Sequence, residues 1–253
     1  ADDVQASGLL HPLGLLGDVD EDDRARVHVA EQHLLAERVL DVALDGAPQR
    51  PGYRSFVGLY DVPVRHGMTI AEITRMVHAR LGLDDAALVT VPMQGWQREM
   101  YFDATGLPWV YPSPNMPTLD TAVVYPGGCL IEGTLLSEGR GTTRPFEVFG
   151  APWVDGEALA RALEGKLPGA ALRPLHFLPT FQKHAKQRCG GVQLHVTDRA
   201  VFRSYEAYLR ILQELLTRYP DAPRYRSEEY EYVVDRPAID LLTGGPEFRE
   251  TVD

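Results

Sequence analysis

The charged residues between Cys129 and Glu147 have the types and spacing that could do chemistry. Three carboxylates and two guanidinium groups lie there among three glycines. Glycine is unfavourable inside helices and strands, so the run predicts a loop. We expect this loop to follow a buried strand, because the apolar run 122–126 precedes it. A buried charge must be paired, so we expect Glu132, Glu138 and Arg140 to line a pocket. The alternative is a solvated loop with surface ion pairs.

Glu132 and Glu138 are the acid/base candidates of this loop. A pair of carboxylates flanking a glycosidic bond is the usual machinery of sugar hydrolysis. A guanidinium such as Arg140 lowers the pKa of a neighbouring carboxylate, whereas burial raises it. The sequence spacing does not fix how far apart the two carboxylates lie.

Other residues are candidates for substrate binding. Arg65 and His66 offer a cation beside a titratable ring in a predicted loop, which suits an anionic group such as a carboxylate. Asn115 lies between two prolines, and its amide suits a sugar or an acetamido group. Thr142 is a further candidate, in the same loop as Arg140. Two alternatives stay open: Arg65 pairs with Asp61, or Asn115 bonds its own backbone in a turn.

Composition excludes several classes of protein. The 253 residues are 44% hydrophobic and 24% charged, which is ordinary for a globular protein, and the net charge is −11. A negative surface repels phosphate, so we expect no nucleic-acid partner. No run approaches the roughly 20 apolar residues of a membrane span, and no signal peptide is visible. The cysteines, Cys129 and Cys189, lack zinc-site spacing, so we expect two buried free thiols, with a disulfide as the alternative if the protein is exported.

The pattern of the chain predicts an α/β fold, a mixed sheet with flanking helices. Thr69 and Glu72 form a capping box for a helix through Leu81, which Gly82 ends. A rigid, proline-rich loop is expected over 106–118. The remaining expected elements are helices over 27–44, 155–167, 205–218 and 236–245, and strands over 56–60, 88–93 and 193–197.

Several ordered motifs together resemble one family. They are Pro63-Val-Arg-His-Gly-Met-Thr69, Pro112-Ser-Pro-Asn-Met-Pro-Thr118, Glu132-Gly-Thr134, Ser137-Glu-Gly-Arg-Gly-Thr-Thr143, Gly150-Ala-Pro-Trp153, Pro179-Thr-Phe181 and Cys189-Gly-Gly-Val-Gln-Leu-His-Val196. The chain is similar in these to the exo-β-N-acetylmuramidases (NamZ-type) of bacterial cell-wall recycling, formerly a family of unknown function. The match runs from about Pro51 to the C-terminus.

The resemblance implies a glycoside hydrolase that releases terminal N-acetylmuramic acid from peptidoglycan fragments, with a muropeptide or disaccharide as substrate. It implies no metal and no organic cofactor. It implies a Rossmann-like half plus a smaller α/β half, with the active site between them, in the periplasm or outside the cell. Residues 51–253 would be the α/β domain that carries the motifs. Residues 1–50 match poorly, as a remnant of the Rossmann-like half and a linker, and most of that half would be missing.

The missing half sets two further expectations. The family's proposed catalytic glutamate lies in a Pro-Glu-His-Gly stretch that this sequence lacks, so we expect hydrolysis by this chain alone to be slow. The alternative is a non-catalytic muropeptide- or sugar-binding module. An uncovered domain face would also favour self-association.

Overall fold

The computed structural model describes residues 45–83 and 88–253. Within them the core is a three-stranded antiparallel sheet of order β1-β3-β2, formed by β1 (Val148–Ala151), β2 (Ala170–Phe177) and β3 (Cys189–Val196). The central strand β3 begins Cys189-Gly-Gly, and a Cβ at Gly190 or Gly191 would collide with a neighbouring backbone carbonyl. Glycine here lets β1 and the chain at Val154 pack directly against β3.

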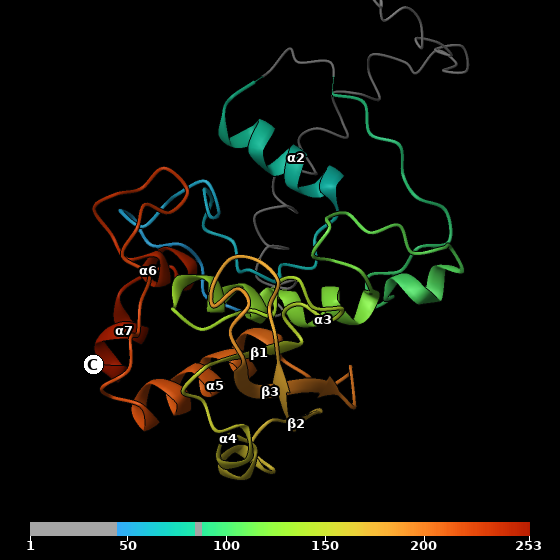
Figure 1. Ribbon diagram of the computed structural model, residues 1–253. Coiled ribbons are helices and arrows are strands. Elements are labelled where there is room, and N and C mark those ends of the chain that lie inside the picture. The colour runs from blue at the N-terminus through green and yellow to red at the C-terminus, as the bar shows by residue number, and fades with distance from the viewer. Residues whose placement is uncertain (1–44, 84–87) are drawn as a thin grey trace, which may run out of the picture.

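Helices surround this sheet (Figure 1). Helix α3 (Leu119–Gly128) packs on α5 (Ser204–Arg218), and α4 (Gly156–Leu163) packs on β2 and β3. The 3₁₀ segment η2 (Cys129–Gly133) continues α3 and packs against α6 (Ala238–Thr243). Helix α7 (Glu247–Val252) follows α6. The hydrophobic core joins buried side chains from all of these elements except β2 and α7, which add the partly buried Ala170, Leu172 and Phe248.

The segment before α3 is built differently. It holds α2 (Ile70–Arg80) and the short 3₁₀ helix η1 (Phe102–Thr105), joined by extended and turn segments. In Figure 1, α2 stands apart from the sheet, on the far side of α3. The capping box is present as predicted: Thr69 accepts from the Glu72 N–H, and Glu72 accepts from the Thr69 N–H.

Several other predicted elements are confirmed. The amphipathic helix over 205–218 is α5, and the short helix near the C-terminus is α6, followed by left-handed Gly244. The helix after Trp153 ends at Leu163, earlier than predicted, and the strand over 193–197 is the end of the longer β3. Residues 106–118 are a loop, which the Trp109 indole closes by donating to the Met116 carbonyl at 3.3 Å. The helix predicted over 27–44 lies outside the described residues.

Four predictions were wrong: three strands and the mixed character of the sheet. The chain over 56–60 and 88–93 is not strand: Phe56 is 77% and Val91 82% exposed, and neither segment pairs with another strand in the described structure. The apolar run 122–126 belongs to a buried helix, since a short apolar run does not distinguish strand from helix. The three strands pair antiparallel only, so the described sheet is not mixed.

A candidate carbohydrate-binding pocket

A pocket of about 560 Å³ opens beside η2. Glu132, Glu138 and Arg140 all line it, as the sequence predicted. The other lining residues come from two distant segments of the chain: Leu135, Gln182, Lys183, Arg226, Glu228, Tyr230 and Glu231. Seven charged side chains and a tyrosine therefore share one concave space.

The fold fixes the two glutamates through rigid neighbours. Glu132 lies in η2, which packs so closely on α6 that a Cβ at Gly133 would meet the Ile239 backbone. Glu138 follows Ser137, whose N–H and carbonyl both bond Gly150 of β1. The Glu138 side chain is 3% exposed and that of Glu132 is 17% exposed. Glu138 is thus a buried group at the edge of the sheet, and Glu132 is the glutamate nearer solvent.

Arg140 holds both glutamates. Gly139 and Gly141 on either side of it have positive φ, and this turn returns the guanidinium toward the sheet. Its Nε donates to Glu138 at 2.8 Å, and an Nη atom donates to Glu132 at 2.6 Å. The two carboxylates are therefore held on neighbouring nitrogens of one planar group. The guanidinium also makes a cation–π contact with Phe146, 5.1 Å from the centre of its ring.

Lys183 and Tyr230 complete the cluster, although neither was among the predicted site residues. The Lys183 ammonium reaches Glu138 at 3.0 Å and donates to the carbonyls of Ile131 and Thr134. The Tyr230 hydroxyl donates to Glu132 at 3.2 Å. Lys183 lies just after the family-like Pro179-Thr-Phe181 motif, which was the available signal. Nothing in the local pattern marks Tyr230.

The surroundings push the pKa values of the two glutamates in opposite directions. Burial raises the pKa of Glu132 above its ordinary value, although Arg140 opposes the shift. Burial alone would also raise the pKa of Glu138, but Lys183 and Arg140 together hold it below its ordinary value. Two carboxylates with diverging pKa values in one pocket are a recurrent arrangement for acid/base work.

Strained backbone surrounds the pocket. In the described ranges, six non-glycine residues have positive φ: Phe146, Gln182, His184, Lys186, Glu231 and Tyr232. Two of them line the pocket, and the ring of Phe146 supports Arg140. Phe146 is held in place because its N–H bonds the Glu138 carbonyl and its own carbonyl accepts from Tyr208. Such strain gathers at functional sites, where the surrounding structure over-determines it.

The structure places Arg65 and His66 outside this pocket. Arg65 donates to the Tyr101 hydroxyl at 3.0 Å, and Asp61 pairs with Arg80 rather than with Arg65. The Nδ1 atom of His66 accepts from the Met68 N–H, and burial lowers the pKa of its ring.

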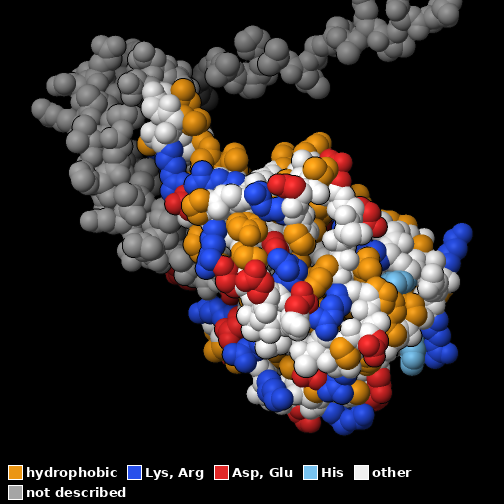
Figure 2. Space-filling view, turned by 90° about the vertical axis from the view of Figure 1, so that its left-hand side faces the viewer, with side chains coloured by type: hydrophobic (Ala, Val, Ile, Leu, Met, Phe, Trp, Pro, Cys, Tyr) orange, Lys and Arg blue, Asp and Glu red, His pale blue; other side chains and the backbone are white. Residues whose placement is uncertain are grey.

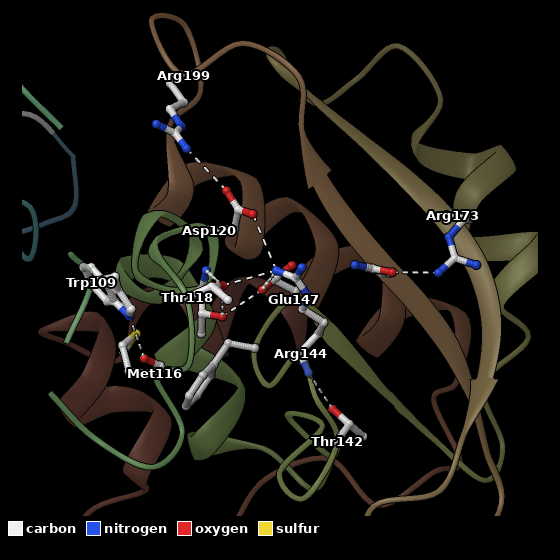
Figure 3. A network of polar contacts seen from close by, with 12 residues as sticks. Trp109, Met116, Thr118, Asp120, Thr142, Arg144, Glu147, Arg173 and Arg199 are labelled. Carbon is white, nitrogen blue, oxygen red and sulfur yellow. Dashed lines mark hydrogen bonds and ion pairs between the residues drawn. The ribbon is translucent and has the colours of Figure 1, made fainter. Parts of the chain in front are cut away.

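Asn115 and Thr142 also do not line the pocket. The Asn115 N–H points to the Ser113 hydroxyl at 3.4 Å, within its own turn. The Thr142 hydroxyl donates to the Gly139 carbonyl and accepts from the Arg144 N–H. It therefore belongs to the turn that carries Arg140 and to a neighbouring polar network (Figure 3).

That network ties helix α3 to two later segments of the chain, which carry Arg144 and Arg199. Asp120 lies between Arg144 and Arg199, at 3.5 and 3.3 Å, as Figure 3 shows. The buried Glu147 accepts from the Thr121 hydroxyl at 2.7 Å. The carboxylates and guanidinium groups of this network pair with one another, which indicates that the network has a structural role.

Residues 45–83 and 88–253 contain no group of three or more histidine, cysteine or acidic residues arranged for a metal ion. They also contain no helix long and apolar enough to cross a membrane. Cys129 and Cys189 are both free thiols.

Comparison with known proteins gives consistent matches. Residues 123–253 match the family described as exo-beta-N-acetylmuramidase NamZ, C-terminal, and residues 36–120 match its N-terminal counterpart. The chain is 42% identical over 211 residues to the peptidoglycan beta-N-acetylmuramidase NamZ of Bacillus subtilis (strain 168), covering 83% of this chain and 49% of that protein. The chain thus spans about half the length of this curated relative.

Two solved structures share the fold. A DUF1343 family protein from Bacteroides fragilis superposes with a TM-score of 0.70 at 32% identity, covering 82% of this chain and 54% of that one. A second from the same organism has a TM-score of 0.59 at 21% identity, covering 90% and 63%. Since one family description matches more than half of the residues and its partner matches most of the rest, the chain belongs to the NamZ family of exo-β-N-acetylmuramidases.

Proposed function

We propose that this chain forms the sugar-binding pocket of a glycoside hydrolase that releases terminal N-acetylmuramic acid from peptidoglycan fragments, in the periplasm or outside the cell. The observation that carries the proposal is the pair Glu132 and Glu138, held on one guanidinium with pKa values displaced in opposite directions. The muramidase activity named for the Bacillus subtilis relative supports the choice of substrate.

The two glutamates take different roles in this proposal. The raised pKa of Glu132 suits a carboxyl group that keeps its proton and gives it to the leaving glycosidic oxygen. The lowered pKa of Glu138 suits a carboxylate that stays ionised and stabilises the positive charge of an oxocarbenium-like transition state. Lys183 and Arg140 keep Glu138 in place and charged.

A chromogenic β-N-acetylmuramide tests this function. The 253-residue chain should release the chromophore slowly, and Glu132→Gln should reduce the release by about 10²–10⁴-fold because a general acid is lost. Glu206→Gln is the matched control, since Glu206 is an exposed glutamate that does not line the pocket. Release that survives Glu132→Gln unchanged would contradict the proposal.

A second candidate function is a non-catalytic sugar-binding module. One observation favours it: both oxygens of Glu138 are already bound by cations, and Arg140 also holds Glu132. Binding of N-acetylmuramic acid without any chromophore release would support this alternative over hydrolysis.

We also propose that further protein, a Rossmann-like half, covers the apolar surface before α3, and that the isolated chain self-associates there. Val89, Val91 and Met93 are 65%, 82% and 60% exposed. Sedimentation of the chain should therefore depend on concentration, and Val91→Glu should reduce the dependence. Val234→Glu is the control, because Val234 is equally exposed but lies in the C-terminal part of the chain. A monomer at every concentration would contradict this.

A further inference from the structure

The pocket contains three cations, and the structure distinguishes them by what their N–H donors already bind. Lys183 uses all three ammonium protons, on two carbonyls and on Glu138. Arg140 uses Nε and one Nη atom on Glu138 and Glu132. Both cations are therefore already engaged by groups of the pocket itself.

Arg226 is the third cation, and it has the weakest ion pairing of the three. Its only carboxylate in the described structure is Glu228, at 3.6 Å, and the Glu228 side chain is 69% exposed to water. Such a surface pair is worth little. One Nη atom donates to the Glu229 carbonyl at 3.2 Å, and no residue of 45–83 or 88–253 bonds the other.

Arg226 is nevertheless held firmly beside the catalytic candidates. Its backbone N–H donates to the Gly133 carbonyl at 3.1 Å, next to Glu132 in the chain. Its guanidinium stacks 5.3 Å from the centre of the Tyr230 ring, whose hydroxyl bonds Glu132. It lies near enough to Lys183 for its charge to contribute to the lowered pKa of that ammonium, which burial chiefly causes. A ligand bound by Arg226 would lie against Glu132.

We infer that Arg226 is the residue that recognises the carboxylate of an acidic amino sugar, and so sets the preference of the pocket for N-acetylmuramic acid. This inference rests on the proposed function. N-acetylmuramic acid differs from N-acetylglucosamine by a lactyl ether, which ends in a carboxylate. A planar guanidinium can bind a carboxylate in two-pronged geometry, which an ammonium cannot. Arg226 fits this role better than Arg65, which lies outside the pocket, or Arg140, which already bonds Glu138 and Glu132.

Titration of the 253-residue chain with the two sugars at low salt tests the inference. The wild-type chain should bind N-acetylmuramic acid about tenfold more tightly than N-acetylglucosamine, as one charge-assisted contact allows. Arg226→Gln should bring the ratio of the two dissociation constants close to one while leaving N-acetylglucosamine binding unchanged. Arg226→Lys should give an intermediate ratio.

Arg236→Gln is the matched control. Arg236 also stacks 5.3 Å from a tyrosine ring, that of Tyr53, and its side chain is similarly exposed, yet it does not line the pocket. It should leave the ratio unchanged. A preference for the acidic sugar that persists in both Arg226 variants would overturn the inference alone. Equal binding of the two sugars by the wild-type chain would also overturn the inference alone, because the pocket would then bind sugars without recognising a carboxylate. Binding of neither sugar would overturn the proposed function as well.

Discussion

Residues 119–253 bury most of their large apolar side chains, whereas residues 45–83 and 88–118 leave most of theirs on the surface. In the described part of the second region, side chains from α3, the sheet, α5 and α6 form one continuous core. In the described part of the first region, Met76 and Met116 are the buried apolar side chains, while Val91, Ile70 and Val110 are at least 78% exposed.

The first region is therefore held by polar contacts with the second rather than by a core of its own. Asp45 accepts from the Tyr205 N–H at the start of α5, at 2.7 Å. Gln49 donates to the Leu241 carbonyl at 2.9 Å, and Tyr101 donates to the Arg199 carbonyl at 3.1 Å. The net contribution of one hydrogen bond to the free energy of unfolding is about 1 kcal/mol. These contacts therefore position the first region without stabilising it strongly.

The ion pairs of the two regions also differ in how deeply they are buried. The ion pairs of the second region include the buried cluster around Glu138, whereas pairs of the first region such as Arg80–Asp61 are exposed to water. On the face seen in Figure 2, positive and negative side chains are interspersed rather than gathered into one field of a single sign. Burial, rather than the number of charges, therefore makes the pocket electrostatically distinctive.

Removing one phenyl ring from each region should give the largest contrast. Phe149 is fully buried against Tyr208, and Phe149→Ala should lower the free energy of unfolding by about 3–5 kcal/mol through lost burial and a cavity. Phe56 is 77% exposed, and Phe56→Ala should cost under about 1 kcal/mol. Urea denaturation of both variants measures the difference. Equal losses would mean that the two regions share one core, and the comparison would fail.

The same division explains which elements the sequence could predict. Helix α2 was predicted to the residue at its start because Thr69 and Glu72 specify it locally. Helix α5 was predicted because its apolar stripe is long and periodic. The runs at 56–60 and 88–93 have strand-like composition, but a strand also needs a partner strand, and none pairs with them in the described structure.

The pocket was predictable only in part for a similar reason. Glu132, Glu138 and Arg140 are close in sequence and lie among glycines, so the sequence predicted a cluster of paired charges. Lys183 and Tyr230 come from distant segments, and only the folded chain brings them to these glutamates. Arg65 and Asn115 looked like ligand residues by type, yet Arg65 bonds the Tyr101 hydroxyl, and Asn115 lies in a turn outside the pocket.

The pH dependence of stability should separate the buried charges from the exposed ones, with a smaller effect. Glu138→Gln should cost about 2 kcal/mol at pH 7, because charge-assisted bonds from Lys183 and Arg140 are weakened in a buried site. Asp61→Asn is the control from the first region, and it should cost less than about 1 kcal/mol because its ion pair with Arg80 is exposed.

The sign follows from proton linkage. The pKa of Glu138 is lowered on folding, so its contribution is fully present above the ordinary value of 4.5 and is lost as the pH falls through the folded value. The penalty of Glu138→Gln should therefore fade in acid. The pKa of Glu132 is raised on folding, so the native state binds the extra proton above 4.5 and wild-type stability falls as the pH rises. Relative to wild type, Glu132→Gln should therefore gain stability over that range.

Urea denaturation of the wild type and the three variants from pH 3 to pH 8 measures these slopes. Opposite slopes for two glutamates on one guanidinium would show that burial dominates at Glu132 and pairing dominates at Glu138. Parallel slopes would contradict the assignment of the proton to Glu132, and with it the division of roles proposed for the pair. The bond from Arg80 lowers the pKa of Asp61 as well, but the pair is exposed, so a shallower profile for Asp61→Asn than for the glutamates would confine strong electrostatics to the buried second region.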